Sequence, residues 1–306
     1  MSKVVKFGGS SLADAKQFKK VADIINADPE RVYVVPSAPG KRFSDDTKVT
    51  DLLYQCYERT ITGEDFAKAF QPVRERFDGI IRELGLSMSL EEEYVKIGTD
   101  FRNGANRDYA ASRGEYLNGI ILADYLGYKF VDAAKGIFFD SKGNFDSDIT
   151  NACLGAILEK TPKAVIPGFY GAMPDGSIKT FSRGGSDFTG SVVAKAAGAS
   201  LYENWTDVSG FLVADPRIVD KPEGIEVITY SELRELSYMG AGVLHEDAIF
   251  PVRSANIPIN IKNTNAPDDA GTLIVPSAKN APAKYLITGK KKKKDFSVIS
   301  IEKDRM

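Results

Sequence analysis

The chain has 306 residues, of which 43 % are hydrophobic and 27 % charged, so its composition predicts a soluble globular protein with one large α/β domain or two lobes. Its 40 lysines and arginines and 42 aspartates and glutamates leave a formal net charge of −2. That balance gives no general attraction to nucleic acid or to an anionic membrane. No apolar run is long enough to span a bilayer. The N-terminus lacks the apolar segment of a secretory signal.

The first 36 residues predict a βαβ unit. Val4–Phe7 and Val32–Pro36 are short, valine-rich runs bounded by turn residues, as buried strands are. Between them, apolar residues recur at helical spacing over residues 12–25, and Ser11 with Asp14 resembles the capping box at a helix start. Such a unit predicts a parallel sheet.

Strand and helix patterns continue to alternate along the chain, which predicts an α/β fold with a layered sheet. Further helices are predicted at residues 50–60, 64–84, 108–126, 148–160, 231–239 and 244–255. Further strands are predicted at residues 163–168, 201–206, 211–214, 258–262 and 272–275, and a second strand–glycine–helix unit at 180–197.

The cysteines and the single histidine predict no metal site or disulfide framework. Cys56 and Cys153 both lie in apolar stretches, so we expect reduced, buried thiols. His245 has no histidine partner, and we expect a structural role for it.

The turn after the first strand combines a lysine with glycines. Lys6 is followed by Gly8, Gly9 and Ser10, and then a helix begins. The order differs from that of a Walker P-loop and from the dinucleotide fingerprint. Glycines still let backbone N–H groups approach an anion, and the helix N-terminus favours negative charge, so a phosphate is one interpretation. An ordinary strand–turn–helix corner with an incidental lysine is the other.

A second turn of this kind favours the phosphate interpretation. The segment 179–199 places Arg183 before paired glycines and Asp187 after them, at the start of a helix. Arginine suits bidentate recognition of a carboxylate, whereas an aspartate at a helix start is often only a cap. Two anion-receiving turns in one chain are what phosphoryl transfer to an anionic acceptor requires.

Five segments, in this order, resemble those of aspartate kinases, which belong to the amino-acid-kinase superfamily. The segments are KFGGSS at 6–11, VVPSAPG at 34–40, SRGE at 112–115, FSRGGSD at 181–187 and WTDVSGFLVADPR at 205–217. The resemblance implies a three-layer αβα sandwich with a central, mostly parallel sheet. It further implies a catalytic domain over residues 1–290 with two lobes, an aspartate side at about 1–178 and an ATP side at about 179–290.

The activity implied is transfer of the ATP γ-phosphoryl group to the β-carboxylate of L-aspartate, with Mg²⁺ accompanying ATP and no metal ion held by side chains alone. The family implies a cytoplasmic homo-oligomer, a dimer, at the entry to lysine, threonine and methionine synthesis. Lys6 and Asp187 would be catalytic: Lys6 would touch the transferring phosphoryl group, and Asp187 would orient Lys6.

The resemblance also implies two sets of binding residues. Those on the phosphate and nucleotide path are Lys6, Gly8, Gly9, Ser10, Thr206, Asp207, Leu212 and Arg217, with Asp215 and Pro216 shaping the last turn. Those around aspartate are Arg183 at a carboxylate, Glu115 at the ammonium group, and Ser37, Thr50 and Ser186 at the rest of the acceptor.

Two positions depart from the family pattern, and both concern the nucleotide. Gly242 in GAGVLH stands where some members have a phosphate-binding lysine, and Leu212 stands where many members have tyrosine. Neither departure touches Lys6, Arg183 or Asp187.

The C-terminal residues 291–306 change in character. The lysine run 290–294 is typical of a solvated linker, and FSVISIEKDRM at 296–306 resembles the first strand of the regulatory ACT domains of this family. A lone strand cannot form an effector site, so we expect activity of this chain to be insensitive to lysine and threonine.

Two other functions remain open at this stage. The first is another enzyme of the superfamily, such as an acetylglutamate, glutamate 5- or UMP kinase. Glu115 distinguishes acceptors with a free ammonium group from an acetylated amine or a nucleotide. The second is a ligand-sensing module without turnover, which an ADP-release assay separates from a kinase.

Overall fold

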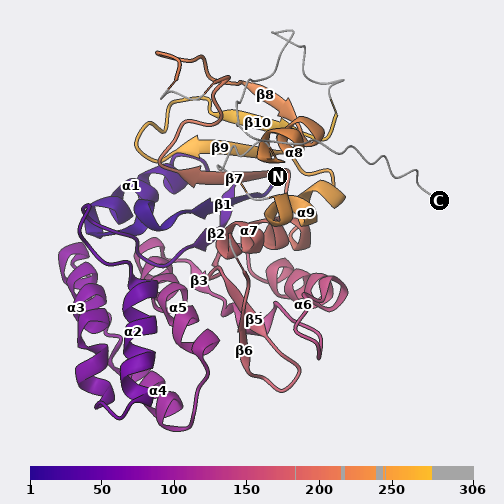
Figure 1. Ribbon diagram of the computed structural model, residues 1–306. Helices are drawn as coiled ribbons and strands as arrows, with labels where there is room; N and C mark the ends of the chain where they lie inside the picture. Colours follow the sequence, from indigo (N-terminus) through magenta and orange to yellow (C-terminus); the bar gives the residue numbers. More distant parts are fainter. Residues whose placement is uncertain (183, 215–217, 239–243, 245, 278–306) are drawn as a thin grey trace, which may run out of the picture.

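The computed structural model describes residues 1–182, 184–214, 218–238, 244 and 246–277. Within these segments, eight strands form one sheet in the order β3-β4-β2-β1-β7-β9-β10-β8, and β5 and β6 form a separate antiparallel pair (Figure 1). Neighbouring strands of the large sheet run parallel except β9 and β10. The strands are β1 (Lys3–Phe7), β2 (Arg31–Pro36), β3 (Lys129–Phe130), β4 (Ala164–Val165), β5 (Tyr170–Ala172), β6 (Ile178–Thr180), β7 (Leu201–Thr206), β8 (Val227–Thr229), β9 (Ile259–Asn263) and β10 (Thr272–Val275).

Two groups of helices cover the sheet, which confirms the predicted α/β sandwich. Figure 1 shows α1 to α5 gathered on one side and α6 to α9 on the other, with α7 packed on β1, β2 and β7. The helices are α1 (Ala15–Asn26), α2 (Val49–Ile61), α3 (Phe66–Leu84), α4 (Glu91–Arg102), α5 (Arg107–Leu126), α6 (Ser147–Glu159), α7 (Gly185–Ala196), α8 (Tyr230–Tyr238) and α9 (Glu246–Ser254), with short 3₁₀ helices η1 (Gly9–Leu12) and η2 (Ala133–Lys135). No helix in the described segments is both long and apolar enough to cross a membrane.

The predicted N-terminal βαβ unit is confirmed, but the predicted start of its helix is wrong. β1 pairs in parallel with β2, and α1 connects them. The cap of α1 is Asp14, whose side chain accepts a hydrogen bond from the backbone N–H of Gln17 at 2.9 Å. Ser11 lies in η1, and its buried hydroxyl hydrogen-bonds Thr264 at 2.7 Å, so it serves tertiary packing.

Sequence patterns predicted the elements of the second half less well. The apolar run 211–214 forms no strand, because its pairing is limited to one isolated bridge between Leu212 and Gly224, with backbone hydrogen bonds from Val213 to Glu223 and from Ile225 to Phe211. The strand before the second glycine turn, β6, pairs with β5 outside the main sheet. β5 and β8 of this half were not predicted at all, and neither were α4 and β3 of the first half.

The two cysteines differ, contrary to expectation. Cys56 is buried in α2, and burial raises the pKa of its thiol to about 11. Cys153 is exposed, because it lies on the outer side of α6. His245 and the whole segment 278–306, with its lysine run and predicted ACT strand, lie outside the described residues.

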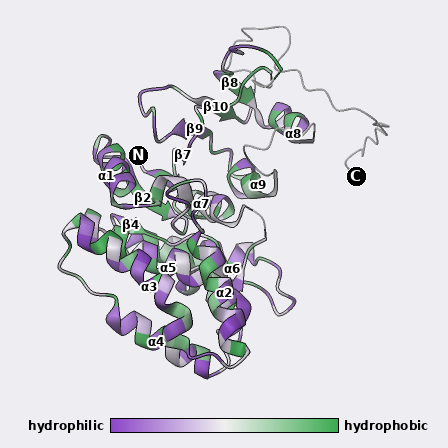
Figure 2. Cartoon of the chain, turned by 60° about the vertical axis from the view of Figure 1, so that its left-hand side comes forward, coloured by the Kyte–Doolittle hydropathy of each residue, from purple (hydrophilic) through white to green (hydrophobic). Residues whose placement is uncertain are grey.

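Helix α5 is the most deeply buried of the described helices. Figure 2 shows α3 and α4 striped in apolar green and polar purple, as expected for helices with one face toward solvent. In α5, by contrast, residues 110–119 are all buried, since α2, β2, β3, β4 and β6 surround it. Four of these residues are polar or charged: Ser112, Arg113, Glu115 and Asn118. Polar groups this deep cost free energy unless hydrogen bonds or a ligand satisfy them.

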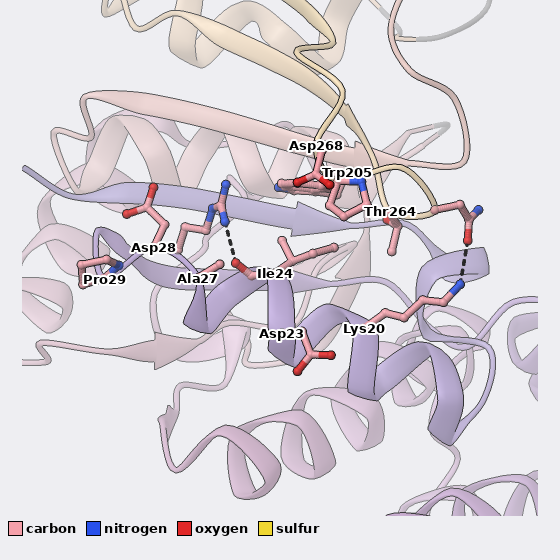
Figure 3. A pocket seen from close by; sticks show the side chains of 12 residues that line it. Lys20, Asp23, Ile24, Ala27, Asp28, Pro29, Trp205, Thr264 and Asp268 are labelled. Atoms are coloured by element: carbon pink, nitrogen blue, oxygen red, sulfur yellow. Dashed lines mark hydrogen bonds between the residues drawn. The ribbon is translucent and has the colours of Figure 1, made fainter.

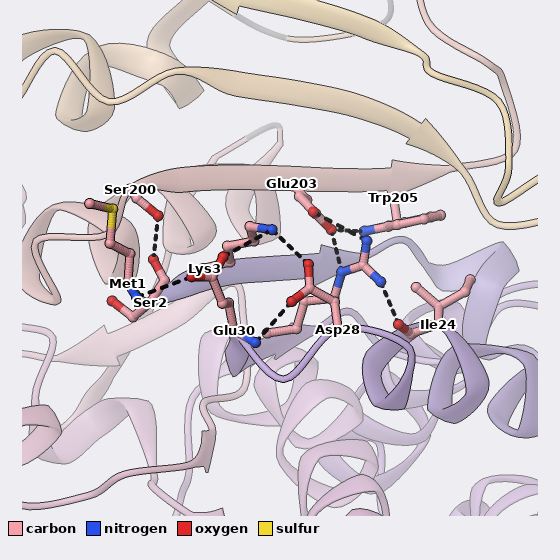
Figure 4. A network of polar contacts seen from close by, with 10 residues as sticks. Met1, Ser2, Lys3, Ile24, Asp28, Glu30, Ser200, Glu203 and Trp205 are labelled. Atoms are coloured by element: carbon pink, nitrogen blue, oxygen red, sulfur yellow. Dashed lines mark hydrogen bonds and ion pairs between the residues drawn. The ribbon is translucent and has the colours of Figure 1, made fainter.

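A polar network joins β2, β7 and α1 on the α1 face of the sheet (Figure 4). Glu203 is 3 % exposed and accepts hydrogen bonds from Arg31 Nε and Trp205 Nε1, each at 2.8 Å. The Arg31 guanidinium also donates to the carbonyl of Ile24 and stacks over the Trp205 ring at 5.2 Å. Each charge in this network is therefore compensated within the fold.

Replacing Arg31 with methionine should destabilise the protein by about 3–5 kcal/mol, because Glu203 would remain buried without its cation. Urea denaturation followed by circular dichroism measures this. Arg59→Met is the control, since its pair with Glu64 lies nearer the surface and its loss should move the urea midpoint much less. Equal midpoints for the two variants would contradict the importance of the Glu203 network.

Candidate active site

The turns singled out in the sequence meet at the carboxyl edge of the parallel strands. Gly8 follows β1 and donates its backbone N–H to the carbonyl of Trp205 on β7 at 3.1 Å. Ser37 follows β2 and donates to the carbonyl of Phe7 at 3.0 Å. Gly168, beyond β4, donates to the carbonyl of Pro36 at 3.1 Å. Ligands of open α/β sheets bind at this edge.

Lys6 lies on the central strand and is bound from two other elements. It is 7 % exposed, and its Nζ lies 2.5 Å from Asp187 Oδ1 in α7. Asn204, its register partner on β7, accepts from Lys6 Nζ through Oδ1 at 3.4 Å and donates to Asp187 Oδ1 through Nδ2 at 2.9 Å. The three side chains form a closed triangle that holds one ammonium group beside Gly8.

The first turn of α7 places Asp187 in this triangle. Gly184 caps the helix at φ 71°, a left-handed conformation that favours glycine. The Tyr202 hydroxyl donates to the backbone carbonyl of Asp187 at 3.1 Å. A Cβ atom at Gly190 would lie 2.4 Å from that hydroxyl, so the contact requires glycine there. The N-terminus of α7, which carries the positive end of the helix dipole, therefore lies beside the Lys6 ammonium group. Both positive groups favour an anion bound next to them.

Glu115 is a second buried ionisable group, and one of its carboxyl oxygens has no hydrogen-bond partner among the described residues. Its residue is 5 % exposed, and its Oε2 is buried without a hydrogen bond among the described residues. Burial raises the pKa of Glu115 to about 8, while the backbone amide of Ala38 opposes that shift. Gly114 lets α5 approach this loop closely, since a Cβ atom there would lie 2.8 Å from the Ala38 Cβ. A cation entering beside Ala38 would satisfy the carboxylate.

Asn118, one turn after Glu115 on α5, links the helix to the same loop. It is fully buried, and its Nδ2 donates to the backbone carbonyl of Ser37 at 2.7 Å. Its Oδ1 is a second buried acceptor without a partner among the described residues. Residues three apart lie on one helix face, so two unsatisfied acceptors face the segment 37–38.

The remaining predicted residues fall into three groups. Gly9 packs against Gly40, and Ser186 lies against Gly168, where an added Cβ atom would come within 2.7 Å of the Ser186 hydroxyl oxygen. Ser10 is exposed, and Thr50 lies half-buried in the first turn of α2. The outer group lies at and beyond the end of β7 and is exposed or half-buried; it consists of Thr206, Asp207 and Leu212.

Arg183, Asp215, Pro216, Arg217 and Gly242 lie outside the described residues. The structure thus brings together Lys6, Asp187 and Gly8 directly. It places Glu115 of α5 beside the loop that follows β2, and Ser37 is part of that loop. No contact joins Thr206, Asp207 or Leu212 to Lys6 among the described hydrogen bonds and ion pairs.

Sequence reasoning missed Asn204 and Asn118. Asn204 alternates with Glu203 and Trp205 along β7, but only the register with β1 shows that it meets Lys6. Asn118 carries a usable signal, since an asparagine in an apolar stretch three residues after Glu115 predicts a shared helix face.

A hollow of about 610 Å³ lies on the other face of the sheet and is not part of this site (Figure 3). Lys20, Asp23 and Ile24 of α1 line one wall, and Trp205 and Asp268 lie opposite. Trp205 adjoins Asn204, and successive side chains of a strand point to opposite faces. Because Asn204 contacts Asp187, the hollow and the Lys6 triangle are separated by the sheet.

Comparisons with known proteins identify the family to which this sequence is similar. Residues 1–263 match the model of the amino acid kinase family. Aspartokinase 3 of Bacillus subtilis is 39 % identical over 292 residues, covering 91 % of this chain and 64 % of that protein. The chain thus spans about three fifths of the length of the curated relatives it matches.

Solved structures of aspartate kinases have a similar fold. The crystal structure of Clostridium acetobutylicum aspartate kinase superposes with a TM-score of 0.89 at 53 % identity, covering 94 % of this chain and 65 % of that chain. E. coli aspartokinase III in complex with aspartate and ADP superposes with a TM-score of 0.78 at 26 % identity, covering 92 % and 66 %.

The raised pKa of Glu115 predicts a pH-dependent stability. The folded carboxyl, with a pKa of about 8, binds more protons than the unfolded one, whose reference value is 4.5. Its contribution to stability is therefore complete below pH 4.5 and is lost as the pH rises through 8. Relative to the wild type, Glu115→Gln should gain a few kcal/mol between pH 5 and pH 8.5.

Urea denaturation at the two pH values measures this difference. Glu92→Gln, on the exposed side of α4, is the control and should follow the wild type at both. If Glu115→Gln also follows the wild type, Glu115 is not a buried, unpaired carboxyl.

Proposed function

The chain belongs to the amino acid kinase family, and from this membership we propose that it is an ATP-dependent aspartate 4-kinase. It would transfer the γ-phosphoryl group of ATP to the β-carboxylate of L-aspartate, yielding 4-phospho-L-aspartate and ADP. The relatives named aspartokinase, and the E. coli enzyme in complex with aspartate and ADP, support this choice of substrates.

The single observation that carries the choice of acceptor is the buried Glu115, whose Oε2 has no hydrogen-bond partner among the described residues. A carboxyl group at this depth costs free energy unless a ligand completes it. The ammonium group of a free amino acid is such a ligand. An acetylated amino acid or a nucleotide acceptor brings no ammonium group, so both fit this position less well.

The chain's own groups suit phosphoryl transfer without a general base. The β-carboxylate of aspartate has an unperturbed pKa of about 3.9 and is already a nucleophile at neutral pH. One of its oxygens forms the new O–P bond while the bond from the γ-phosphorus to the bridging oxygen breaks, and ADP leaves with that electron pair. We propose that Lys6 neutralises charge on the phosphoryl oxygens while Asp187 and Asn204 hold its Nζ in place.

We propose that Mg²⁺ arrives bound to the phosphates of ATP. The described part of the chain contains no group of three or more histidine, cysteine, aspartate or glutamate side chains that could hold an ion. Magnesium sites of nucleotide enzymes commonly combine water and substrate phosphates with one or two carboxylates. The ion would add charge neutralisation to that of Lys6.

The other assignments belong to the same proposal. Gly8, Gly9 and Ser10 would line the phosphate path. Arg183, Ser37, Thr50 and Ser186 would surround aspartate, and Thr206, Asp207, Leu212 and Arg217 would lie at the nucleotide. The division into an aspartate side and an ATP side near residue 178, the cytoplasmic location and the homodimer also remain predictions.

A panel of acceptors tests the function. The protein is incubated with Mg-ATP and L-aspartate, N-acetylglutamate, L-glutamate or UMP, and ADP release is followed. Acyl phosphate is trapped in parallel as its hydroxamate. We expect ADP and hydroxamate with L-aspartate only. Hydroxamate with another carboxylate, phosphorylation of UMP, or no turnover with any acceptor would overturn the proposal.

Lys6→Ala should lower kcat by about 10²–10³ while leaving the affinity for aspartate nearly unchanged, because the lost charge acts on the phosphoryl group. Steady-state kinetics and calorimetric titration with aspartate measure the two quantities. Lys16→Ala, on the outer side of α1, is the control and should keep the wild-type kcat. A normal kcat in Lys6→Ala would exclude the role.

Two substitutions at Asn204 separate positioning from packing. Asn204→Leu removes both polar contacts at similar volume and should lower kcat about tenfold, with smaller changes in both KM values. Asn204→Asp puts a second carboxylate beside Asp187, so one of the two should retain a proton to higher pH. The acid limb of its pH–kcat profile should therefore move upward, whereas that of Asn204→Leu should not. Identical profiles for the two variants would contradict a polar role for Asn204.

A further inference from the structure

Arg76, on α3, reaches from the outer helical layer to the candidate active site. Its residue is 6 % exposed. Its Nε and Nη2 donate to the backbone carbonyl of Ala13 at 3.3 and 3.1 Å, and Nη2 also donates to the backbone carbonyl of Gly40. One guanidinium group thus binds two carbonyls that are 27 residues apart in the chain and follow different strands.

Those carbonyls belong to the two turns that form the site. The phosphate turn, residues 8–13, follows β1, and the acceptor turn, residues 37–40, follows β2. The turns touch backbone to backbone, since the Gly40 N–H donates to the Gly9 carbonyl at 2.8 Å. A Cβ atom at Gly9 would lie 2.8 Å from the Ala38 carbonyl oxygen, and one at Gly40 would lie 2.7 Å from the Gly9 carbonyl carbon. Arg76 binds across this junction from behind.

The charge of Arg76 is balanced by a carboxylate that is itself bound in place. Arg76 Nη1 donates to Asp46 Oδ2 at 2.7 Å. Asp46 also accepts from the Arg42 side chain and backbone N–H at 2.8 and 2.9 Å. Hydrogen bonds from the Arg42 side chain lower the pKa of Asp46. Burial acts in the opposite direction but is outweighed, so this pKa lies well below its usual value. Arg76 therefore remains paired, and its two other donor groups remain available to the turns.

We propose that Arg76 is a positioning residue that aligns the acceptor turn with the phosphate turn, and so directs the phosphoryl group to the amino acid instead of to water. The inference rests on the proposed function. Transfer in line requires the carboxylate oxygen to lie within about 3–3.5 Å of phosphorus, and a misplacement of about 1 Å costs roughly 10²-fold in rate. Glu115, Asn118 and Ser37 all depend on the acceptor turn, so its displacement moves the acceptor and leaves Lys6 in place.

Loss of this alignment has a chemical signature. In the coupled reaction, a carboxylate oxygen forms the O–P bond as ADP leaves, so each ADP is accompanied by one acyl phosphate. When the acceptor is displaced, a water oxygen forms the bond instead, giving inorganic phosphate and a proton with the same ADP. The ratio of ADP to trapped hydroxamate therefore reports alignment and does not depend on the fraction of folded protein.

The experiment compares wild type, Arg76→Met, Arg76→Lys and the control Arg82→Met, an exposed arginine of the same helix. ADP release and hydroxamate are measured together at saturating Mg-ATP and L-aspartate. We expect equal amounts of the two products in wild type and Arg82→Met. In Arg76→Met, hydroxamate formation should fall about 10²-fold and ADP release much less. Arg76→Lys should lie between, because one ammonium group cannot bind both carbonyls in the same geometry.

The outcomes are distinct. If Arg76→Met is only less folded, both products fall together, the ratio stays at that of the wild type, and the proposed role of Arg76 is wrong. An equal rise of the ratio of ADP to hydroxamate in Arg82→Met would also overturn the proposed role of Arg76. The effect would then not depend on the contact between the phosphate turn and the acceptor turn. ADP without hydroxamate in the wild type would reject the proposed function itself, and the role of Arg76 with it.

Discussion

The ion pair between Lys6 and Asp187 is the interaction around which the site is organised. A lysine on the central strand of a sheet is costly to bury, and this one is acceptable only because α7 presents a carboxylate at 2.5 Å and β7 an amide beside it. That requirement sets the order of the three neighbouring elements. β1 must pair with β7 in the register that places Lys6 opposite Asn204, and α7 must cross both strands at its first turn.

The two buried ionisable groups of the site differ in how the fold satisfies them. Lys6 is compensated within the fold, so its position is set before any ligand arrives. One carboxyl oxygen of Glu115 lacks a partner among the described residues, and α5, which is largely buried, holds the group beside Ala38. A preorganised cation suits the phosphoryl group, on which charge is redistributed during transfer, whereas an unsatisfied carboxyl favours selection of an ammonium ligand. The predicted responses of Lys6→Ala and Glu115→Gln differ for this reason.

Local patterns predicted the parts of the fold that local forces determine. β1, β2 and α5 match their predicted ranges closely, because valine-rich strands and apolar periodicity are properties of short segments. The segment 211–214 has the composition of a strand but finds only one bridge, and Cys153 lies in an apolar stretch yet on the outer side of α6. Asn204 and Arg76 could not be predicted, since their roles depend on strand register and on contacts across many residues.

Glycine explains why the phosphate and acceptor turns can be so close and why they need external support. Backbone contact at Gly9 and Gly40 brings two strands' ends together with no side chain between them. The same absence removes the packing that would otherwise fix their relative position, and glycine is the residue with the most backbone freedom to lose. A buried guanidinium hydrogen-bonds carbonyls of both turns and, in the role proposed for Arg76, restores that constraint. The support for this junction then comes from α3, and no side chain of either glycine has to occupy the edge of the sheet.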